Sequence, residues 1–242
     1  MRSAIGIIPA RYSSKRFPGK ALALINGRPL IEHVYQRAQK AQSLEQVFIA
    51  TDDERISRKC RSFGAKVRMT SSDHTTGTER VSEAAEDLDF PIIISIQGDE
   101  PLVNPSMIDS LVKTLQQEKI IMGTLRQKNR NLRYLNDENI VKIVIDSDEN
   151  ALYFSRAPIP FSPSSFFWHH IGIYGFKKEL LIKYKKLPPS FLEKSENLEQ
   201  LRVLENGYKI KTIETKYPTL SVNIPEDIPQ VEKIMNRQKN HE

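Results

Sequence analysis

Short apolar runs alternate with helix-like stretches along the first half of the chain. Residues 4–9, 46–51 and 91–97 are nearly continuous apolar runs of strand length, and after each of them apolar residues recur at helical spacing. Continuous apolar strands separated by helices are typical of a parallel sheet that is covered on both faces. The pattern therefore predicts an α/β fold in which helices flank a mostly parallel sheet.

The pattern changes after about residue 125. Residues 140–145 and 151–155 have strand-like sequences joined by a short turn, which predicts a β-hairpin. No stretch has the composition of a long flexible linker, so we expect one domain over residues 1–242 with an insertion-like part over residues 137–208. The remaining expected strands are residues 65–70, 170–176 and 208–215, and the expected helices are residues 29–41, 53–63, 78–88, 105–117, 197–206 and 225–237.

The composition is that of an ordinary soluble domain, with 242 residues, 39% hydrophobic and 27% charged. A single cysteine, Cys60, excludes an internal disulfide framework and a multi-cysteine zinc site. No apolar run approaches the roughly 18–20 residues of a membrane span. The N-terminus also turns polar too early for a signal peptide. We therefore expect a cytoplasmic protein without membrane contact.

The net charge of +6 leaves three classes of anionic partner: nucleic acid, a membrane surface and small anions. One cluster of cations lies in residues 9–20, PARYSSKRFPGK, which contain Arg11, Lys15, Arg16 and Lys20. This segment follows an apolar strand, and open α/β sheets bind ligands at the carboxyl ends of their strands. Small residues there let backbone N–H groups approach an anion. The position favours an anion-binding loop over a merely solvated one.

Known alternatives to such a loop lack their motifs. The spacing of neither a Walker P-loop nor a dinucleotide-binding G-x-G-x-x-G segment is present. No nucleic-acid recognition motif accompanies the positive charge either, and the basic residues 177–186 alternate with Leu and Ile as a surface helix does. A small anionic ligand is the favoured partner.

Two further segments carry candidate chemistry. Asp99 follows the most apolar strand, where a carboxylate facing a basic loop suits a divalent metal held between protein and phosphate oxygens; an acid at a helix start is the alternative. Residues 73–80 place hydroxyl groups, a glycine and Arg80 at a helix start, which suits either anion or base recognition or an ordinary helix cap. We interpret the acidic pair Asp146 and Asp148 as part of a hairpin turn.

Eight motifs occur in a fixed order over almost the whole chain. They are IIPARYSSKRFPGKAL (7–22), IATDDERI (49–56), DHTTGTER (73–80), IQGDEPLV (96–103), ALYFSRAPIP (151–160), HIGIYGF (170–176), ENLEQLRVLENG (196–207) and PEDI (225–228). Together they resemble the sugar-activating nucleotidyltransferases, and among these the 3-deoxy-D-manno-octulosonate (Kdo) cytidylyltransferases. One motif would be weak support, but eight in family order make the resemblance highly specific.

The resemblance implies a Rossmann-like fold of the nucleotide-diphospho-sugar transferase type. It implies transfer of CMP from CTP to Kdo with release of pyrophosphate, which activates the sugar for lipopolysaccharide synthesis. Mg²⁺ is the implied cofactor, and a homodimer without nucleic-acid partner is the implied assembly. Residues 1–136 and 209–242 would then form the CTP-binding part, and residues 137–208 the sugar-binding and dimerisation part.

The resemblance also assigns residues to roles. The implied catalytic residues are Arg11, Lys20 and Asp99, and the implied metal ligands are Asp99 and Asn223. The implied nucleotide-binding residues are Pro9, Ala10, Arg11, Ser13, Ser14, Lys20, Met69, Thr70, Ser71, Asp73, Thr76, Gly77 and Arg80. The implied sugar-binding residues are Gln97, Arg156, His170, Tyr174, Glu199 and Gln200.

The implied sugar site agrees with the chemistry of its residues. The planar fork of Arg156 can bind a sugar carboxylate through two hydrogen bonds. His170 and Tyr174 are four positions apart on an expected strand and therefore lie on one face.

Three positions depart from the family pattern. Thr76 and Glu79 conservatively replace its usual Ser and Asp, whereas Asn223 stands where the family has an aspartate that completes the metal site. An amide oxygen carries no charge, so Mg²⁺ should bind more weakly. Two alternatives therefore stay open: a cytidylyltransferase for a related acid sugar, and a catalytically weakened nucleotide-binding homologue.

Overall fold

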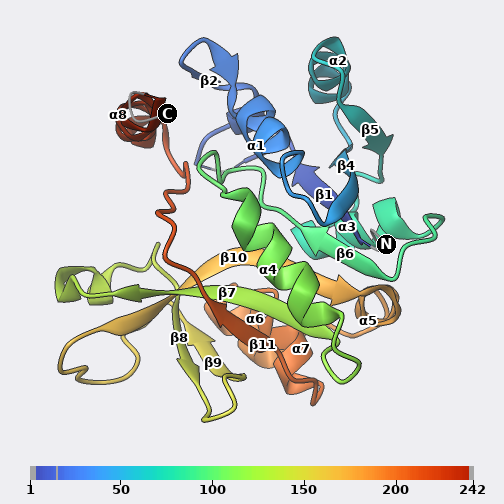
Figure 1. The fold of residues 1–242 in the computed structure, drawn as a ribbon. Helices are drawn as coiled ribbons and strands as arrows, with labels where there is room; N and C mark the ends of the chain where they lie inside the picture. The colour runs from blue at the N-terminus through green and yellow to red at the C-terminus, as the bar shows by residue number, and fades with distance from the viewer. Residues whose placement is uncertain (1–3, 15, 240–242) are drawn as a thin grey trace.

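A mixed nine-stranded sheet forms the centre of the computed structural model, which describes residues 4–14 and 16–239 (Figure 1). The order of strands across it is β11 (Lys211–Glu214), β7 (Met122–Asn129), β10 (Phe167–Lys177), β6 (Ile92–Ser95), β1 (Ala4–Ala10), β4 (Leu44–Thr51) and β5 (Lys66–Met69). The hairpin of β8 (Lys142–Ile145) and β9 (Ala151–Ser155) joins the sheet where β8 pairs with β10. The expected hairpin is confirmed.

Parallel pairing joins β6, β1, β4 and β5, and it also joins β11 to β7. Among the seven strands of this order, the long strand β10 alone has the opposite direction, because it runs antiparallel to both β6 and β7. The predicted α/β class with a mostly parallel sheet is confirmed. Strand β7 has no counterpart among the predicted elements, since its apolar residues are interrupted by Gly123 and followed by polar ones after Leu125.

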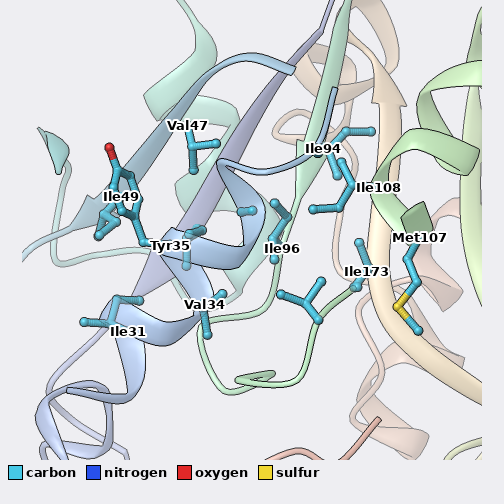
Figure 2. Close-up of a cluster of buried hydrophobic side chains, with 14 of the residues drawn as sticks. Ile31, Val34, Tyr35, Val47, Ile49, Ile94, Ile96, Met107, Ile108 and Ile173 are labelled. Carbon is cyan, nitrogen blue, oxygen red and sulfur yellow. The ribbon is translucent and has the colours of Figure 1, made fainter. Parts of the chain in front are cut away.

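Helices cover both faces of the sheet. Because side chains alternate along a strand, Ile92 and Ile94 of β6 belong to one core cluster and Ile93 to another. The first cluster includes side chains of α1 (Leu30–Ala38) and α4 (Pro105–Leu115), and Figure 2 shows its centre around Val34 and Ile108. The second includes α3 (Gly77–Ala85), α5 (Lys178–Tyr184) and α7 (Leu201–Glu205). The remaining helices are α2 (Glu54–Ser62), α6 (Phe191–Glu196) and α8 (Ile228–Lys239).

The predicted helix over residues 197–206 is wrong in its first part. Asn197 adopts the left-handed conformation (φ 53°) that ends the unpredicted helix α6, and Gln200 is the residue that precedes α7. Glu199 therefore lies in a turn between two short helices. The predicted helix over residues 225–237 begins with a 3₁₀ turn, Pro225–Asp227, before α8.

Within the described ranges, every helix is too short or too polar to cross a lipid bilayer. The predicted division of the chain into nucleotide and sugar parts stays a prediction.

Candidate active site

A cavity of about 710 Å³ opens at the carboxyl ends of β1 and β6. Strands β4 and β5 lie on one side of β1, whereas β6 and β10 lie on its other side. Open α/β sheets bind ligands at such a switch point, where the chain turns from one side to the other. The lining residues are Pro9, Ala10, Arg11, Ser13, Ser14, Arg16, Lys20, Ala21, His74, Thr75, Thr76, Gly77, Arg80, Gln97, Gly98, Asp99, Asn197 and Asn223.

Most predicted nucleotide residues lie in this lining, together with both predicted metal ligands. Met69, Thr70, Ser71 and Asp73 lie outside it, and Lys15 falls outside the described residues. Thr70 accepts a hydrogen bond from Arg80 Nη1 at 2.6 Å, and the Ser71 carbonyl accepts another at 3.4 Å. These two residues therefore brace a side chain of the cavity wall.

The basic loop after β1 is held by its own backbone. The Tyr12 carbonyl accepts hydrogen bonds from Ser14 N and Gly19 N, each at 2.9 Å. Gly19 has φ 71°, and a Cβ atom there would lie 3.2 Å from the Tyr12 ring, so both conformation and space favour glycine. The Arg55 guanidinium also stacks on the Tyr12 ring, and its carbon lies 3.3 Å from the ring centre.

Lys20 and Asp99 form an ion pair inside the cavity, with 2.6 Å between Nζ and Oδ2. The Asp99 side chain is 26% exposed, so it can reach a ligand while Lys20 orients it. The backbone also positions Asp99. Val222 N donates a hydrogen bond to the Asp99 carbonyl at 2.9 Å. The neighbouring Gly98 packs so closely on β1 that a Cβ atom there would lie only 2.9 Å from the Pro9 carbonyl oxygen.

Asn223 lines the same cavity as Asp99, and its side chain contacts the guanidinium of Arg16. Arg16 Nη2 donates to Asn223 Oδ1 at 3.1 Å, and Arg16 Nη1 donates to Asn139 Oδ1 at 2.7 Å. Asp227 accepts hydrogen bonds from the backbone N–H groups of Asn223 and Ile224, so it caps the start of the 3₁₀ turn before α8. Arg16 thus connects the basic loop with the segment before β8.

The donor chemistry of Asp99 and Asn223 fits a hard divalent cation. Mg²⁺ takes oxygen ligands and is commonly held by one or two protein groups together with substrate phosphates. Within residues 4–14 and 16–239, no group of three His, Cys, Asp or Glu residues could hold a metal by protein ligands alone. The two oxygen donors therefore suit a magnesium ion that is shared with a phosphate-bearing ligand.

Glu100, next to Asp99, is directed elsewhere. It is buried and accepts a hydrogen bond from Ser221 Oγ, and burial raises its pKa to about 7. A carboxyl that resists ionisation is a poor metal ligand, in line with the preference for Asp99. Asp146 accepts hydrogen bonds from the backbone and side chain of Asn150 in the β8–β9 turn, so the interpretation as a structural acid is confirmed.

The predicted sugar residues other than Gln97 lie outside this lining, in a largely buried group behind the cavity. His170, Tyr174 and Gln200 are buried, whereas Arg156 and Glu199 are partly exposed. His170 and Tyr174 lie on one side of β10 with ring centres 5.5 Å apart, as their spacing predicts. Tyr174 Oη donates to Gln200 Oε1 at 3.0 Å, while Gln200 Nε2 is buried without a hydrogen-bond partner among the described residues. Burial keeps His170 neutral and lowers its pKa to about 3. The group connects to the cavity at Gly172, where an added Cβ would lie 3.5 Å from Gln97 Cγ.

Arg156 is fixed by neighbours in this part of the fold. Its Nε donates to the Glu196 carbonyl at 3.0 Å and its Nη1 to the Glu138 carbonyl at 2.8 Å. The Glu196 carboxylate accepts from Arg156 N at 2.9 Å. The described residues supply no hydrogen bond to Nη2. The expected pair of hydrogen bonds to a carboxylate would therefore require the Arg156 side chain to give up one of its present partners.

Six lining residues have no role in the predicted site: Arg16, Ala21, His74, Thr75, Gly98 and Asn197. All six lie inside the motifs that carry the resemblance, so their positions were available signals. The positive φ of Asn197 turns the chain between α6 and α7, and sequence spacing gives no sign of this turn.

An α/β sheet with a cation-rich, acid-bearing cavity at its switch point defines a nucleotide-binding enzyme. The Cytidylyltransferase profile matches residues 5–213. A 3-deoxy-manno-octulosonate cytidylyltransferase from Solibacter usitatus is 48% identical over 238 residues, or 96% of this chain and 94% of that one. Its counterpart from Geotalea daltonii is 44% identical over 247 residues, or 96% and 98% of the two chains.

The solved structures agree. CMP:2-keto-3-deoxy-manno-octonic acid synthetase, complexed with CTP, superimposes with a TM-score of 0.91 at 36% identity and covers 97% of this chain and 99% of its own. The 4-diphosphocytidyl-2C-methyl-D-erythritol synthase of Anaerococcus prevotii, at 14% identity and a TM-score of 0.66, shares the fold. The chain belongs to the cytidylyltransferase family, and it is a nucleotidyltransferase that groups with the Kdo cytidylyltransferases. The predicted resemblance is confirmed.

Proposed function

We propose that this protein transfers CMP from CTP to the C2 hydroxyl of Kdo, with release of pyrophosphate. The cavity at the switch point is the observation that carries the proposal, because Arg11, Arg16, Lys20 and Arg80 supply positive charge around the single lining carboxylate of Asp99 among the described residues. Such an excess of cations matches a triphosphate. All the lining residues except Asn223 also lie in the motifs that carry the family resemblance.

In this proposal Arg11, Arg16 and Lys20 bind the triphosphate and stabilise the leaving pyrophosphate. Asp99 and Asn223 hold Mg²⁺, which when bound neutralises charge on the α-phosphate and lowers the pKa of the attacking hydroxyl. Gly77 and its neighbours at the start of α3 face the remaining part of the nucleotide. Catalysis then depends on positioning and charge neutralisation without a covalent enzyme intermediate.

The buried group behind Gln97 is proposed to bind the acid sugar. The unpartnered donor of Gln200 and the neutral ring of His170 can serve sugar hydroxyls, and Arg156 Nη2 can serve the carboxylate. Because this group lies outside the present lining, sugar binding in this proposal involves a local opening between Gln97 and Gly172.

A homodimer in the cytoplasm, acting in lipopolysaccharide synthesis, completes the proposal. Two large apolar side chains on β9 and the loop after it support a contact between copies: Leu152 is 60% exposed and Phe161 is 96% exposed. Isolated exposed apolar residues are common, but Phe161 is almost wholly in solvent, which disfavours it on a monomer.

Pyrophosphate release tests the proposed reaction. The assay compares CTP with UTP, and Kdo with an amino-Kdo and a sialic acid, at saturating Mg²⁺. Rapid release with CTP and Kdo alone is the expected result. Preference for another acid sugar would favour a cytidylyltransferase for a related acid sugar. CTP binding without pyrophosphate release would favour a catalytically weakened homologue, as Asn223 at the metal site suggests.

A further inference from the structure

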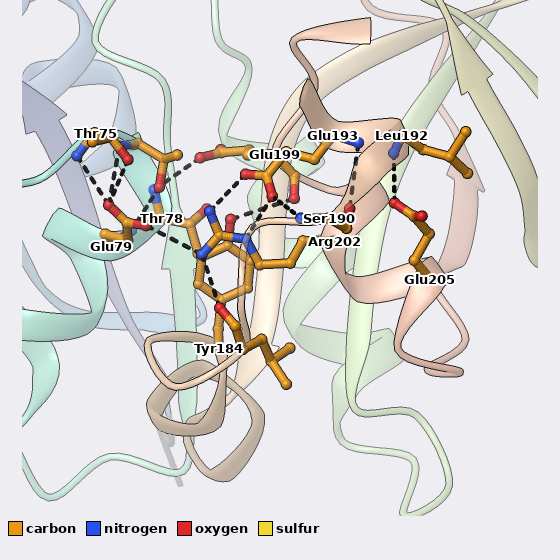
Figure 3. Close-up of polar contacts among 12 residues, drawn as sticks. Thr75, Thr78, Glu79, Tyr184, Ser190, Leu192, Glu193, Glu199, Arg202 and Glu205 are labelled. Atoms are coloured by element: carbon orange, nitrogen blue, oxygen red, sulfur yellow. Dashed lines mark hydrogen bonds and ion pairs between the residues drawn. The ribbon is translucent and has the colours of Figure 1, made fainter. Parts of the chain in front are cut away.

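A buried polar network joins helix α7 to the first turn of helix α3 (Figure 3). Arg202 of α7 is 2% exposed, and its Nε and Nη2 donate to the two oxygens of Glu193, each at 2.7 Å. Its Nη1 donates to Glu79 Oε1 at 3.1 Å. The Tyr184 ring lies 4.5 Å from the guanidinium carbon. One arginine therefore binds two carboxylates that belong to separate parts of the chain.

Glu79 connects this arginine to the wall of the cavity. Its second oxygen, Oε2, accepts hydrogen bonds from Thr75 N at 2.9 Å, Thr75 Oγ1 at 3.0 Å and Thr76 N at 3.3 Å. Thr76 Oγ1 in turn accepts from Glu79 N at 3.2 Å, which closes a capping box at the start of α3. Both threonines line the cavity. Glu79 thus shapes the lining with one oxygen and binds α7 with the other.

A second contact joins the same two segments. Glu199 Oε2 accepts a hydrogen bond from Thr78 N at 3.1 Å, so the turn before α7 contacts the first turn of α3 directly. Its neighbour Gln200 accepts from the Tyr174 hydroxyl. The start of α3 therefore docks on the segment that carries the predicted sugar-binding residues.

Stability alone is a weak reason for this ion pair. Removing charges from water costs several kcal/mol per ion, and apolar replacements of a buried pair are often equally stable. The fork of Arg202 instead fixes geometry, because it holds Glu193 of α6 and Glu79 of α3 in one plane. Fixed geometry is what a binding site needs from residues that do not contact the ligand.

We propose that the Arg202–Glu79 ion pair positions the cavity wall of Thr75 and Thr76 for CTP and thereby couples nucleotide affinity to α7. Arg202 and Glu79 are positioning residues in this scheme, since they act through the two threonines. The inference rests on the proposed placement of CTP in this cavity.

Calorimetric titration of the full chain with CTP, without sugar, tests the coupling. Glu79→Gln and Glu193→Gln each remove one negative partner from the same guanidinium, but of the two only Glu79 contacts the lining threonines. We expect Glu79→Gln to raise the Kd of CTP about tenfold. Glu193→Gln should lower thermal stability and change that Kd less than about twofold. Arg202→Lys should also raise the Kd, and the double variant Arg202→Lys/Glu79→Gln should show less than the product of the two effects.

Thermal unfolding of each variant establishes that it is folded at the titration temperature. If Glu193→Gln is unfolded at that temperature, Glu205→Gln takes its place as the control, because Glu205 accepts a hydrogen bond from Leu192 N on α6 rather than from Arg202. Equal changes for Glu79→Gln and the control, or no change for either, overturn the proposal. Arg11→Ala separates the two levels of inference. If Arg11→Ala weakens CTP binding and Glu79→Gln does not, the positioning role alone is wrong. If Arg11→Ala has no effect, the placement of CTP is wrong and the positioning role falls with it.

Discussion

Lys20 Nζ donates to Asp99 Oδ2 at 2.6 Å, so a cation of the loop after β1 orients the one carboxylate that the described lining presents to a ligand. The two residues are 79 positions apart and follow neighbouring parallel strands. Because the carboxyl ends of β1 and β6 meet at one edge of the sheet, the fold creates this pair without any local signal. The pair is only partly exposed, at 18% and 26%, so it is both held and accessible.

Replacement of Asp99 by alanine should reduce the rate of pyrophosphate release by roughly 10²–10³-fold, because the Mg²⁺ that would neutralise the α-phosphate loses its charged protein ligand. The protein should stay folded, since the side chain is partly exposed. Steady-state kinetics and circular dichroism check the two expectations. Asp148→Ala, at an exposed acid of the β8–β9 turn, is the matched control. Turnover near that of the control would remove Asp99 from the metal site.

Asn223→Asp should lower the Mg²⁺ concentration needed for the half-maximal rate several-fold. A carboxylate adds one negative charge to the oxygen donors that line the cavity with Asp99, and the charge count of the ligands tunes divalent-cation affinity. Magnesium titrations of the wild type and the variant, at fixed CTP and Kdo, measure the change. An unchanged or higher magnesium requirement would argue against residue 223 as a metal ligand.

Much of the first half of the fold could be predicted because β1, β4 and β6 are nearly continuous apolar runs and a chemical motif includes or follows the end of each. This places Arg11 and Asp99 at the same edge of the sheet from sequence alone. Strand β7 escaped prediction because Gly123 interrupts its apolar residues and only polar ones follow Leu125, and it becomes a strand by pairing with β10 and β11. Tertiary pairing here overrides a weak local pattern.

The candidate site was predictable to the extent that its residues lie in contiguous motifs. The contacts between segments that are distant in the sequence were not predictable. Arg202 and Glu79 are 123 positions apart, and no spacing rule connects them. Likewise, two of the nitrogens of Arg156 bind main-chain carbonyls, which depend on the turn geometry of α6 and on the segment before β8. Side-chain type predicts what a residue can bind, whereas the fold decides whether it is already occupied.

Gly98→Ala should impair catalysis more than stability. The new Cβ would lie 2.9 Å from the Pro9 carbonyl oxygen, and a backbone atom cannot yield as a side chain does. The resulting shift would separate Asp99 from the loop after β1, so kcat should fall by roughly tenfold or more. Gly123→Ala is the control, because its Cβ would meet the movable Leu111 methyl at 3.3 Å, away from the cavity. Equal kinetic effects of the two changes would contradict this explanation.

Phe161→Ser combined with Leu152→Ser should shift the protein from dimer to monomer. Both side chains are largely exposed, and removing their apolar surface takes away the attraction proposed to hold two copies together. Light scattering during size-exclusion chromatography measures the mass of each form. Phe191→Ser serves as control, because that ring is 77% exposed on a different element, α6. A dimeric double variant, or a wild type that is monomeric at all concentrations, would contradict the proposed interface.

Acid should destabilise the protein in part through His170. Burial lowers the pKa of this histidine from 6.5 to about 3, so below pH 6.5 the unfolded chain takes up a proton that the folded chain does not. The stability of the fold therefore decreases as the pH falls from about 6.5 towards 3. At pH 5.5 the loss from this one residue is on the order of 1 kcal/mol. Urea unfolding of the wild type and His170→Gln at pH 7.5 and pH 5.5 measures it: the wild type should lose on the order of 1 kcal/mol more than the variant between the two pH values. Equal losses would show that His170 is protonated in the folded protein, and the neutral ring proposed for the sugar site would then be wrong.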